Sequence, residues 1–414
     1  MDRGGRIVVL GGGGPFIVGL VDALATAPDP PPPGEVVLVG RSRDTLDLVA
    51  AYGRSVLEPR GWRVSAETET GVALAGATAV VNLIRFGGLE GRGRDERLAA
   101  DLGVVADETV GPAGLAAAIR IAPGHRALAA TLIERCPDAA VLNMANPLGC
   151  STEILRRGGV ERAVGLCELP LVTVRQACHV LGVPATQVDW RVAGLNHRSF
   201  VYRLELEGRD LLDALPRALG TAAIGGIESD EIASLHAIPM KHHALGHVRA
   251  MPGVRGRAAE LVAARADILE ELRRDPRRSP PSLRRRPQPW FADALVPMLA
   301  AIRRSEPRSL VVNVPSTDGV VHEVCAAVSA DGVEPAADGA PGPEVARRIE
   351  AFVEHERRVL LAALEPGIDT IRAALAADPL IPVLDRTAAE RILRDVSVGP
   401  AGSTSHHASG IESS

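Results

Sequence analysis

The sequence predicts an α/β fold, in which a Rossmann-like domain with a mostly parallel sheet is followed by a C-terminal α+β domain. Two observations support this prediction. Short apolar strands alternate with helices as far as Gly165, and four glycines separate the first strand from the first helix. Such alternation produces a parallel sheet, because each helix returns the chain across the sheet. We expect domains at residues 1–165 and 166–395, and a tail at 396–414 with the composition of a disordered segment.

The individual elements follow from apolar runs and the residues that interrupt them. In the first domain, strands are predicted at 6–10, 35–39, 79–84 and 139–144, and helices at 17–27 and 45–57. The run Pro28 to Pro33 ends the first helix, because proline lacks a backbone N–H and clashes with the preceding turn. Further strands are predicted at 162–166, 191–195, 202–206 and 310–314, and helices at 260–273, 291–304 and 344–363. The segment 274–289, rich in Arg, Pro and Ser, is expected to be a solvated loop or a mobile lid.

Composition narrows the class of protein. The chain has 414 residues, of which 46% are apolar, enough to bury a sizeable core. A net charge of −5 and a pI of about 6.2 argue against a nucleic-acid or membrane-surface partner. No apolar run reaches the length of a transmembrane helix, about 18 residues, and the first strand begins too early for a signal peptide. The five cysteines form no CxxC pair, which indicates a reducing compartment, so we expect a cytoplasmic protein.

The glycine run predicts a dinucleotide site, with a purely structural tight turn as the alternative. Its four residues are Gly11, Gly12, Gly13 and Gly14. They follow a strand and open a helix, so the backbone can approach a pyrophosphate at the helix N-terminus. After the second strand, the acidic residue that holds the ribose of NAD is missing, and Arg41 and Ser42 stand there instead. These two residues either bind the 2′-phosphate of NADP or are simply exposed.

Two isolated residues predict a metal site. Cys167 and His197 each follow a predicted strand, at the sheet edge where open α/β folds place their sites. A thiolate and an imidazole, with positions left open for substrate oxygens, suit a divalent Lewis-acid ion. The remaining cysteines lack this context and are expected to be structural: Cys136, Cys150, Cys178 and Cys325. The pair His406-His407 lies in the tail and is expected to be solvated.

Several short segments occur in the order found in one enzyme family. After the glycine turn they are 85–96 (RFGGLEGRGRDE), 107–114 (DETVGPAG), 136–139 (CPDA), Asn146-Pro147, 165–170 (GLCELP), 194–197 (GLNH), Asn313-Val314, Gly319 and 378–380 (DPL). With this set, the sequence resembles glycoside hydrolase family 4, the nicotinamide- and divalent-metal-dependent glycosidases. The resemblance is greatest to the 6-phospho-β-glucosidase branch and covers the chain to about residue 395.

The resemblance implies a glycosidase that hydrolyses a 6-phospho-β-glucoside or a similar anionic glycoside. Its cofactors would be NAD, or NADP, and a divalent metal, with Mn²⁺ as the family expectation. The reaction would proceed by transient oxidation at C3, deprotonation at C2, elimination of the leaving group and addition of water. A homodimer or homotetramer is also implied, with no nucleic-acid or membrane partner.

The resemblance also assigns roles to particular residues. These are Cys167 and His197 for the metal; Asn82 for the cofactor, beside the glycine turn; Arg85 and Arg92 for the anionic group; Asn146 and Asn196 for the sugar; and Glu108 at the floor of the site.

Three positions depart from the family's pattern. Glu168 follows the cysteine where the phospho-specific branches have Asn or Asp, and it either contacts the sugar or acts as a general acid. The family's tyrosine base, which comes shortly after an Ile-Pro pair, is absent. Either His242, which aligns best, or His243 has taken this role, or the step is lost and His242 is a surface or metal-proximal histidine. The family's Arg-Gly-Gly-Ala segment is replaced by 284–290 (RRRPQPW), which still offers arginines for a phosphate.

Other functions fit the same residues less well. An NAD(P)-dependent sugar oxidoreductase that stops at a 3-keto product would result from loss of the base. A non-catalytic dinucleotide-binding sensor would have no need for the thiolate–imidazole pair. A 2-hydroxy-acid dehydrogenase shares the first domain but gives the Cys167 segment no role.

Overall fold

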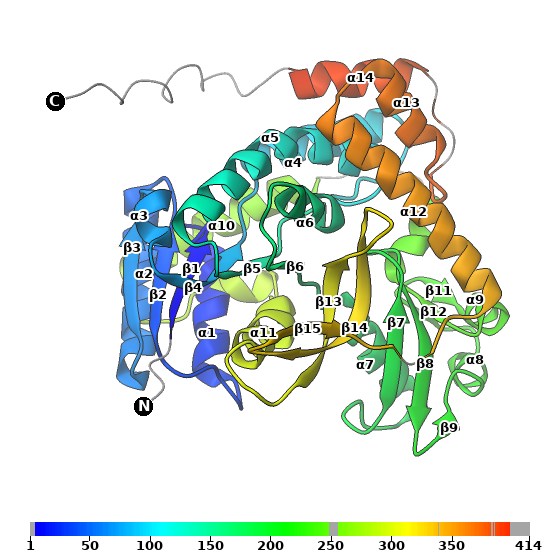
Figure 1. Ribbon diagram of the computed structural model, residues 1–414, viewed down its shortest axis with the longest axis horizontal. Helices are drawn as coiled ribbons and strands as arrows, with labels where there is room; N and C mark the ends of the chain where they lie inside the picture. The colour runs from blue at the N-terminus through cyan, green and yellow to red at the C-terminus, as the bar shows by residue number, and fades with distance from the viewer. Residues whose placement is uncertain (1–4, 248–255, 338, 382–383, 385, 398–414) are drawn as a thin grey trace.

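A nine-stranded sheet with the order β15-β14-β13-β6-β5-β4-β1-β2-β3 forms the centre of the molecule (Figure 1). The structure is a computed structural model that describes residues 5–247, 256–337, 339–381, 384 and 386–397. Six of the strands are parallel: β1 (Arg6–Leu10), β2 (Glu35–Val39), β3 (Arg63–Glu67), β4 (Ala77–Asn82), β5 (Ala140–Asn143) and β6 (Ala163–Gly165). Their order, 3-2-1-4-5-6, is that of dinucleotide-binding folds, and it confirms the predicted fold class.

Alternate residues of the parallel strands face two separate cores. Ile7 and Val9 of β1 pack into one cluster, and Val8 and Leu10 pack into another. This alternation follows from the two-residue period of a strand, and it explains why these strands are apolar throughout. The helices of this half are α1 (Val18–Thr26), α2 (Arg43–Leu57), α3 (Thr70–Leu74), α4 (Gly88–Asp101), α5 (Gly111–Arg135) and α6 (Leu148–Arg157). Single 3₁₀ turns precede α1 (Pro15–Ile17) and follow α2 (Glu58–Arg60).

Strands from the second half of the chain complete the same sheet. β13 (Arg308–Pro315) pairs antiparallel with β6, and β14 (Val321–Ser329) and β15 (Gly332–Pro335) continue outward. Helix α10 (Arg257–Arg274), a π-helical turn (Phe291–Leu295) and α11 (Val296–Ala301) pack on the first core through residues such as Ile268 and Phe291. The expected boundary at residue 165 therefore does not separate two bodies, because residues 257–335 share the core of the first domain.

A second, smaller sheet with the order β12-β8-β7 stands beside the first. Its strands are β7 (Asp189–Ala193), β8 (Phe200–Leu206), β12 (Ile238–Pro239) and, paired with β8, β9 (Arg209–Asp210). Around it lie α7 (Leu169–Leu181), α8 (Leu215–Leu219), α9 (Ser229–Leu235) and the hairpin of β10 (Ala223–Ile224) and β11 (Ile227–Glu228). The chain ends in α12 (Pro343–Leu364), α13 (Ile368–Ala376) and α14 (Arg386–Ser397), and α12 runs beside this sheet in Figure 1.

Three predictions about the second half need comment. The helix expected at 291–304 begins as a π turn and ends at Ala301, so it is shorter than its apolar run. The segment 274–289 contains a 3₁₀ turn (Pro281–Arg285), and the Ser282 hydroxyl ties it to α10 by donating to Glu271, 2.8 Å away. All but the first two residues of the expected tail lie outside the described residues. Among the described helices, none has both the length and the apolar character needed to cross a membrane.

Candidate active site

A pocket of about 420 Å³ lies at the carboxyl ends of the parallel strands. Gly11, at the end of β1, lines it together with Gly14. Cys167, His197 and His242 line the same pocket. In open α/β sheets this edge is the usual place for a ligand, because several loops and helix N-termini converge there. One cavity therefore unites the glycine turn with the residues predicted to bind a metal.

The glycine turn has the geometry that a phosphate-binding turn needs. Gly11 has a φ of 89°, a conformation that other residues adopt only at a cost. At Gly12 a Cβ atom would lie 2.8 Å from the Cα of Leu38, so no larger residue fits against β2. Gly14 then precedes the 3₁₀ turn that leads into α1. Gly11 and Gly14 face the pocket, whereas Gly12 and Gly13 pack against β2 and α2.

Three residues predicted to contact the cofactor lie elsewhere. Ser42 is the N-cap of α2, where its hydroxyl accepts a hydrogen bond from the Thr45 amide, and Arg41 is exposed beside it. Neither lines the pocket. Asn82 is fully buried at the end of β4, and its amide group donates to the Oδ1 atom of Asn143, 2.8 Å away. The Asn82 side chain therefore holds strands together and does not reach the pocket.

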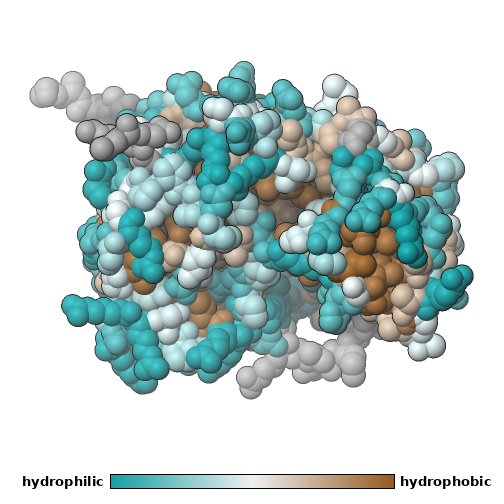
Figure 2. Space-filling view, turned by 90° about the horizontal axis from the view of Figure 1, so that it is seen from below, coloured by the Kyte–Doolittle hydropathy of each residue, from teal (hydrophilic) through white to brown (hydrophobic). Residues whose placement is uncertain are grey.

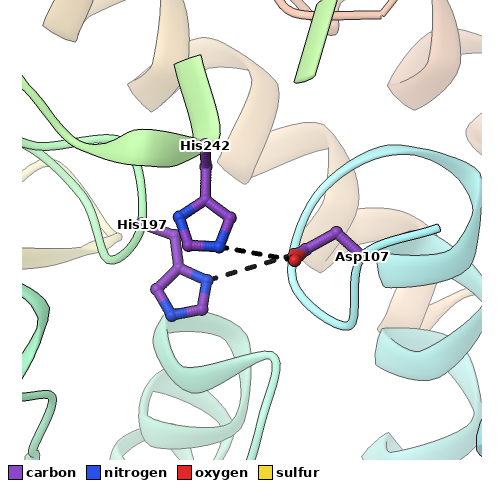
Figure 3. A group of neighbouring side chains, drawn as sticks. All are labelled: Asp107, His197 and His242. Carbon is purple, nitrogen blue, oxygen red and sulfur yellow. Dashed lines mark ion pairs between the residues drawn. The ribbon is translucent and has the colours of Figure 1, made fainter. Parts of the chain in front are cut away.

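Asp107, His197 and His242 come from three separate segments and point toward one another (Figure 3). The Nε2 atom of His242 lies 3.4 Å from Oδ2 of Asp107, and Nδ1 of His197 lies 4.0 Å from Oδ1. The two imidazole rings stack with centroids 3.9 Å apart. Although burial opposes ionisation, His242 and His197 hold the pKa of Asp107 well below its usual range. Burial, and secondarily His242, lower the pKa of His197 to about 3, so this ring is neutral.

The turn that carries His197 is held by Glu323 on β14. Asn196 and Ser199, on either side of the turn, donate to the Glu323 carboxylate over 3.1 and 2.6 Å. The Glu323 amide in turn donates to the Gly194 carbonyl at 2.8 Å. His197 itself has a φ of 65°, a left-handed conformation that is uncommon outside glycine and clusters at functional sites. Asn196, predicted to bind the sugar, is buried and does not line the pocket.

Cys167 and Glu168 follow β6 and open helix α7. The Cys167 thiol lies 3.9 Å from the Glu168 carboxylate. Burial, together with Glu323 and Glu168, raises the pKa of Cys167 well above its ordinary value, so its sulfur is a thiol unless a cation is bound. Burial also raises the pKa of Glu168, which favours the protonated acid. Both residues line the pocket.

The Glu108 carboxylate contacts three of the residues that are predicted to face substrate. Arg85 and Arg92 each place a guanidinium nitrogen 2.8 Å from its carboxylate, and the Asn146 amide donates to it at 2.9 Å. Although burial opposes ionisation, Arg85 and Arg92 lower the pKa of Glu108 to about 2. All four side chains line the pocket. The charges of these two arginines are thus partly neutralised within the protein.

Two further cations face the same pocket. Arg286 lies over the rings of Phe16 and Trp290, with its Cζ atom 4.8 and 5.0 Å from their centroids. Burial lowers the pKa of Arg286 to about 10, so it stays charged, and among the described residues it forms no ion pair. Lys241 stands beside His242 and also lines the pocket. Positive charge at this point is therefore available to an anionic ligand.

Several residues of the pocket have a functional position that no local feature of the sequence indicates. Asp107 lies in one of the segments that match the family. Its contact with His197 and His242 could not be predicted, because both histidines lie far from it in the chain. Glu323 lies in an ordinary amphipathic strand. Arg286 was one of five arginines between 277 and 286, and only packing distinguishes it.

The strand order, the glycine turn and the pocket at the carboxyl edge define the class: a dinucleotide-binding α/β protein with a thiol and imidazoles at the same site. Sequence comparison identifies the family. Residues 6–183 match the model for the family 4 glycosyl hydrolases, and residues 192–381 match that for their C-terminal domain. The chain belongs to glycosyl hydrolase family 4, which confirms the resemblance inferred from the sequence.

Two of the similar proteins are named as 6-phospho-beta-glucosidases. A Bacillus subtilis (strain 168) protein named "Probable 6-phospho-beta-glucosidase" is 28% identical over 429 residues, covering 96% of each chain. The 6-phospho-beta-glucosidase BglT of Thermotoga maritima is also 28% identical, over 209 residues and half of each chain.

Solved structures have the same fold. The 6-phospho-beta glucosidase of Thermotoga maritima, solved with NAD and glucose-6-phosphate, superimposes with a TM-score of 0.83 at 23% identity, covering 95% of this chain and 97% of that one. A 6-phospho-alpha-glucosidase from gut microorganisms, solved with NAD and Mn²⁺, gives a TM-score of 0.81 at 19% identity, with coverage of 95% and 97%.

Proposed function

We propose that the protein is an NAD- and divalent-metal-dependent glycosidase that hydrolyses a 6-phospho-β-glucoside or a similar anionic glycoside. One observation carries this proposal: a single pocket is lined both by the glycine turn and by Cys167, His197 and His242. Membership of family 4 and the names of the relatives agree with it. The closely similar fold of a glucosidase solved with NAD and glucose-6-phosphate gives further support.

The residues present fit both cofactors. Gly11 and Gly14 leave room for a pyrophosphate in front of α1, and the close approach of Gly12 to β2 keeps the turn tight. Cys167 and His197 supply the sulfur and nitrogen ligands expected for a divalent ion, and the buried Nδ1 atom of His197 has no hydrogen-bond partner. When bound, the dinucleotide supplies a reversible hydride acceptor and the ion supplies a Lewis acid for the sugar hydroxyls. Mn²⁺ and NAD are our expectation for this chain, because related structures contain them.

The side chains that line the pocket supply the remaining functions, which are proton transfer and substrate binding. His242 takes the position of the family's tyrosine and accepts the proton from C2, and Asp107 stabilises the imidazolium that results. Glu168, whose pKa is raised by burial, lines the pocket where it can donate to the leaving group or to a sugar hydroxyl. Asn146 is held by Glu108 in an orientation that presents its carbonyl to a hydroxyl group. Arg85 and Arg92 frame the same wall of the pocket.

Arg286 is the side chain best placed to recognise an anionic group. It carries a full charge in a pocket, two aromatic rings fix its plane, and it lies in the segment that replaces the family's Arg-Gly-Gly-Ala. Arg286→Gln should raise KM for a 6-phosphorylated substrate about 10- to 100-fold, the value of one lost charge-assisted hydrogen bond. The matched control is Arg285→Gln, because Arg285 is exposed and pairs with Asp267. Equal effects of the two substitutions would contradict this role.

The activity is tested with p-nitrophenyl β-glucoside 6-phosphate and its unphosphorylated twin, in the presence of Mn²⁺, reductant and either NAD or NADP. Turnover of the phosphorylated compound alone is the expected result. Nicotinamide reduction in step with product would instead identify a sugar oxidoreductase that stops at the 3-keto stage. Cofactor binding without turnover of any glycoside would indicate a sensor.

The cellular setting belongs to the same proposal. None of the five cysteines forms a disulfide, and four of them are buried, which agrees with a cytoplasmic location.

Apolar residues gather in a patch on the face shown in Figure 2, which supports a homodimer or homotetramer. Light scattering coupled to gel filtration measures this directly, and a monomer at micromolar concentration would contradict it.

A further inference from the structure

His243 lies in the interior behind the pocket, although the two residues before it line that pocket. Its side chain is 5% exposed, and Lys241 and His242 face the cavity while His243 does not. A general base must reach the proton that it removes, so His243 cannot be the base in this arrangement. The contacts of this second histidine with the protein interior therefore define its role.

The ring of His243 is held by two aromatic rings and by the backbone. The rings of Phe200 and Phe352 lie 4.6 and 5.3 Å away, centroid to centroid, and both meet the imidazole edge to face. His243 also hydrogen-bonds to the backbone carbonyl of Arg198. Since its Nε2 atom is buried without a partner among the described residues, the donor is Nδ1. Burial lowers the pKa of His243 to about 3, so the ring is neutral and carries a single N–H.

This bond is one of two that tie the turn of His242 to the segment of His197. The first comes just before His242, where the Met240 amide donates to the Ser199 carbonyl at 3.1 Å. The second is the side-chain bond of His243, just after it. Between them, the His243 amide donates to the Met240 carbonyl at 3.0 Å and closes the 3₁₀ turn. His242 is therefore fixed on both sides against the same neighbouring segment.

The position of the His242 ring depends on this attachment. It stacks on His197 with centroids 3.9 Å and planes 5° apart, and its Nε2 atom lies 3.4 Å from Asp107 (Figure 3). Both partners belong to other segments, so a rotation of the turn would move His242 away from both. Displacement of a reacting group by about 1 Å can slow a reaction by about 100-fold.

We propose that His243 is a positioning residue, whose Nδ1–H bond to the Arg198 carbonyl holds His242 where it accepts the proton from C2. The proposal rests on the proposed function for the role of His242. It assigns the requirement to the donor at Nδ1, because Nε2 has no partner that its removal would leave unsatisfied. The aromatic contacts serve to orient this donor.

Two substitutions separate the hydrogen bond from the packing. His243→Leu fills much of the space of the ring but has no donor, whereas His243→Asn keeps an N–H near the place of Nδ1 and leaves a void. We expect His243→Leu to lower kcat about 10- to 100-fold with little change in KM, and His243→Asn to retain most of kcat. Thermal unfolding should rank them in the opposite order, since the void destabilises the asparagine variant. The matched control is His179→Leu, at an exposed position of α7, which should behave as wild type.

Two further measurements distinguish positioning from support of the fold. With deuterium at C2 of p-nitrophenyl β-glucoside 6-phosphate, the isotope effect on kcat should increase in His243→Leu, because removal of this proton becomes the slow step. The second measurement needs no substrate. In protein with ¹³C at Cε1 of histidine, the signal that disappears in His242→Gln belongs to His242. Stacking on His197 shields it, so it should shift in His243→Leu and stay in place in His243→Asn.

Unchanged kcat and an unchanged His242 signal in folded His243→Leu would overturn the proposal. Equally low kcat in the leucine and asparagine variants would overturn it too, because the donor would then have no effect. A wild-type protein that cleaves no glycoside, but whose His242 signal responds to the two variants as expected, would refute the proposed function and support the positioning of His242 by His243.

Discussion

At the residue scale, Asp107 and Glu108 are adjacent in the chain but serve opposite sides of the pocket. Asp107 faces two imidazoles, whereas Glu108 pairs with Arg85 and Arg92. Two neighbouring carboxylates can both remain ionised here because each is surrounded by cationic groups or hydrogen-bond donors. This arrangement links the predicted metal residues to the predicted substrate residues through one dipeptide.

The ion pairs of Glu108 predict a pH-dependent contribution to stability. Its pKa is about 2 in the folded protein and about 4.5 when unfolded, so the carboxylate stabilises the fold above pH of about 4.5. This stability, at most about 3 kcal/mol, is lost as the pH falls toward 2. Urea unfolding of wild type and Glu108→Gln should show a difference at neutral pH that shrinks below pH of about 4.5. A difference independent of pH would contradict the assignment.

At the element scale, the turn between β1 and α1 depends on how closely it approaches β2. The amides of Gly11 and Gly12 both donate to the Val39 carbonyl, at 3.0 and 2.7 Å. Only a residue without a Cβ fits at position 12, since the Leu38 backbone occupies that space. The β2 strand therefore sets the shape of the loop that faces the pocket.

Gly12→Ala should move this turn away from β2. We expect a loss of about 1–3 kcal/mol in unfolding free energy, as for overpacking elsewhere, and NAD affinity reduced at least tenfold. Gly71→Ala is the control, because a Cβ in α3 meets only Arg135 atoms at 3.5 Å or more, and alanine is the better helix former. Titration with NAD followed by calorimetry measures the effect, and wild-type affinity in Gly12→Ala would argue against a pyrophosphate at the turn.

At the scale of the whole molecule, helix α12 contacts and stabilises the turn that carries His197. Arg198 is fully buried and forms an ion pair with Glu356. It also lies 2.8 Å from Nδ1 of His355 and over the ring of Phe352. Residues 352, 355 and 356 are one turn apart and share one face of the helix. The C-terminal helices thus position a pocket residue that lies far earlier in the chain.

Removal of this contact should destabilise the protein and weaken its metal site together. Arg198→Met leaves Glu356 buried without a cation, which costs about 3–5 kcal/mol. The double variant Arg198→Met with Glu356→Leu removes both charges and should recover most of that loss. Urea unfolding and Mn²⁺ titration of the three proteins give both quantities. An equally unstable double variant would show that packing, and not the charge pair, dominates.

The sequence predicted the parallel strands because their apolar runs and turns are local signals. Residues 6–10 and 35–39 are strands with the expected bounds. It could not predict that β13 joins β6, since the pairing of Asn313 with Gly165, so distant in the chain, leaves no local trace. The same limit explains Asn82 and Asn196, which have suitable chemistry and position in the chain but turn into the buried interior.

The sequence by itself determined the family, the fold class and the segments that form the pocket, because these depend on short motifs whose order is preserved. Only the tertiary structure decided which side chains meet. Asp107 and His242 lie far apart in the chain, and their contact depends on how the two sheets are placed against each other. Arg85 and Arg92 similarly pair with Glu108, whereas Arg286 contacts two aromatic rings and has no ion-pair partner among the residues that the structure describes. The residue types determine which interactions are chemically possible. Distances and burial arise only on folding, and they determine which partner each residue contacts.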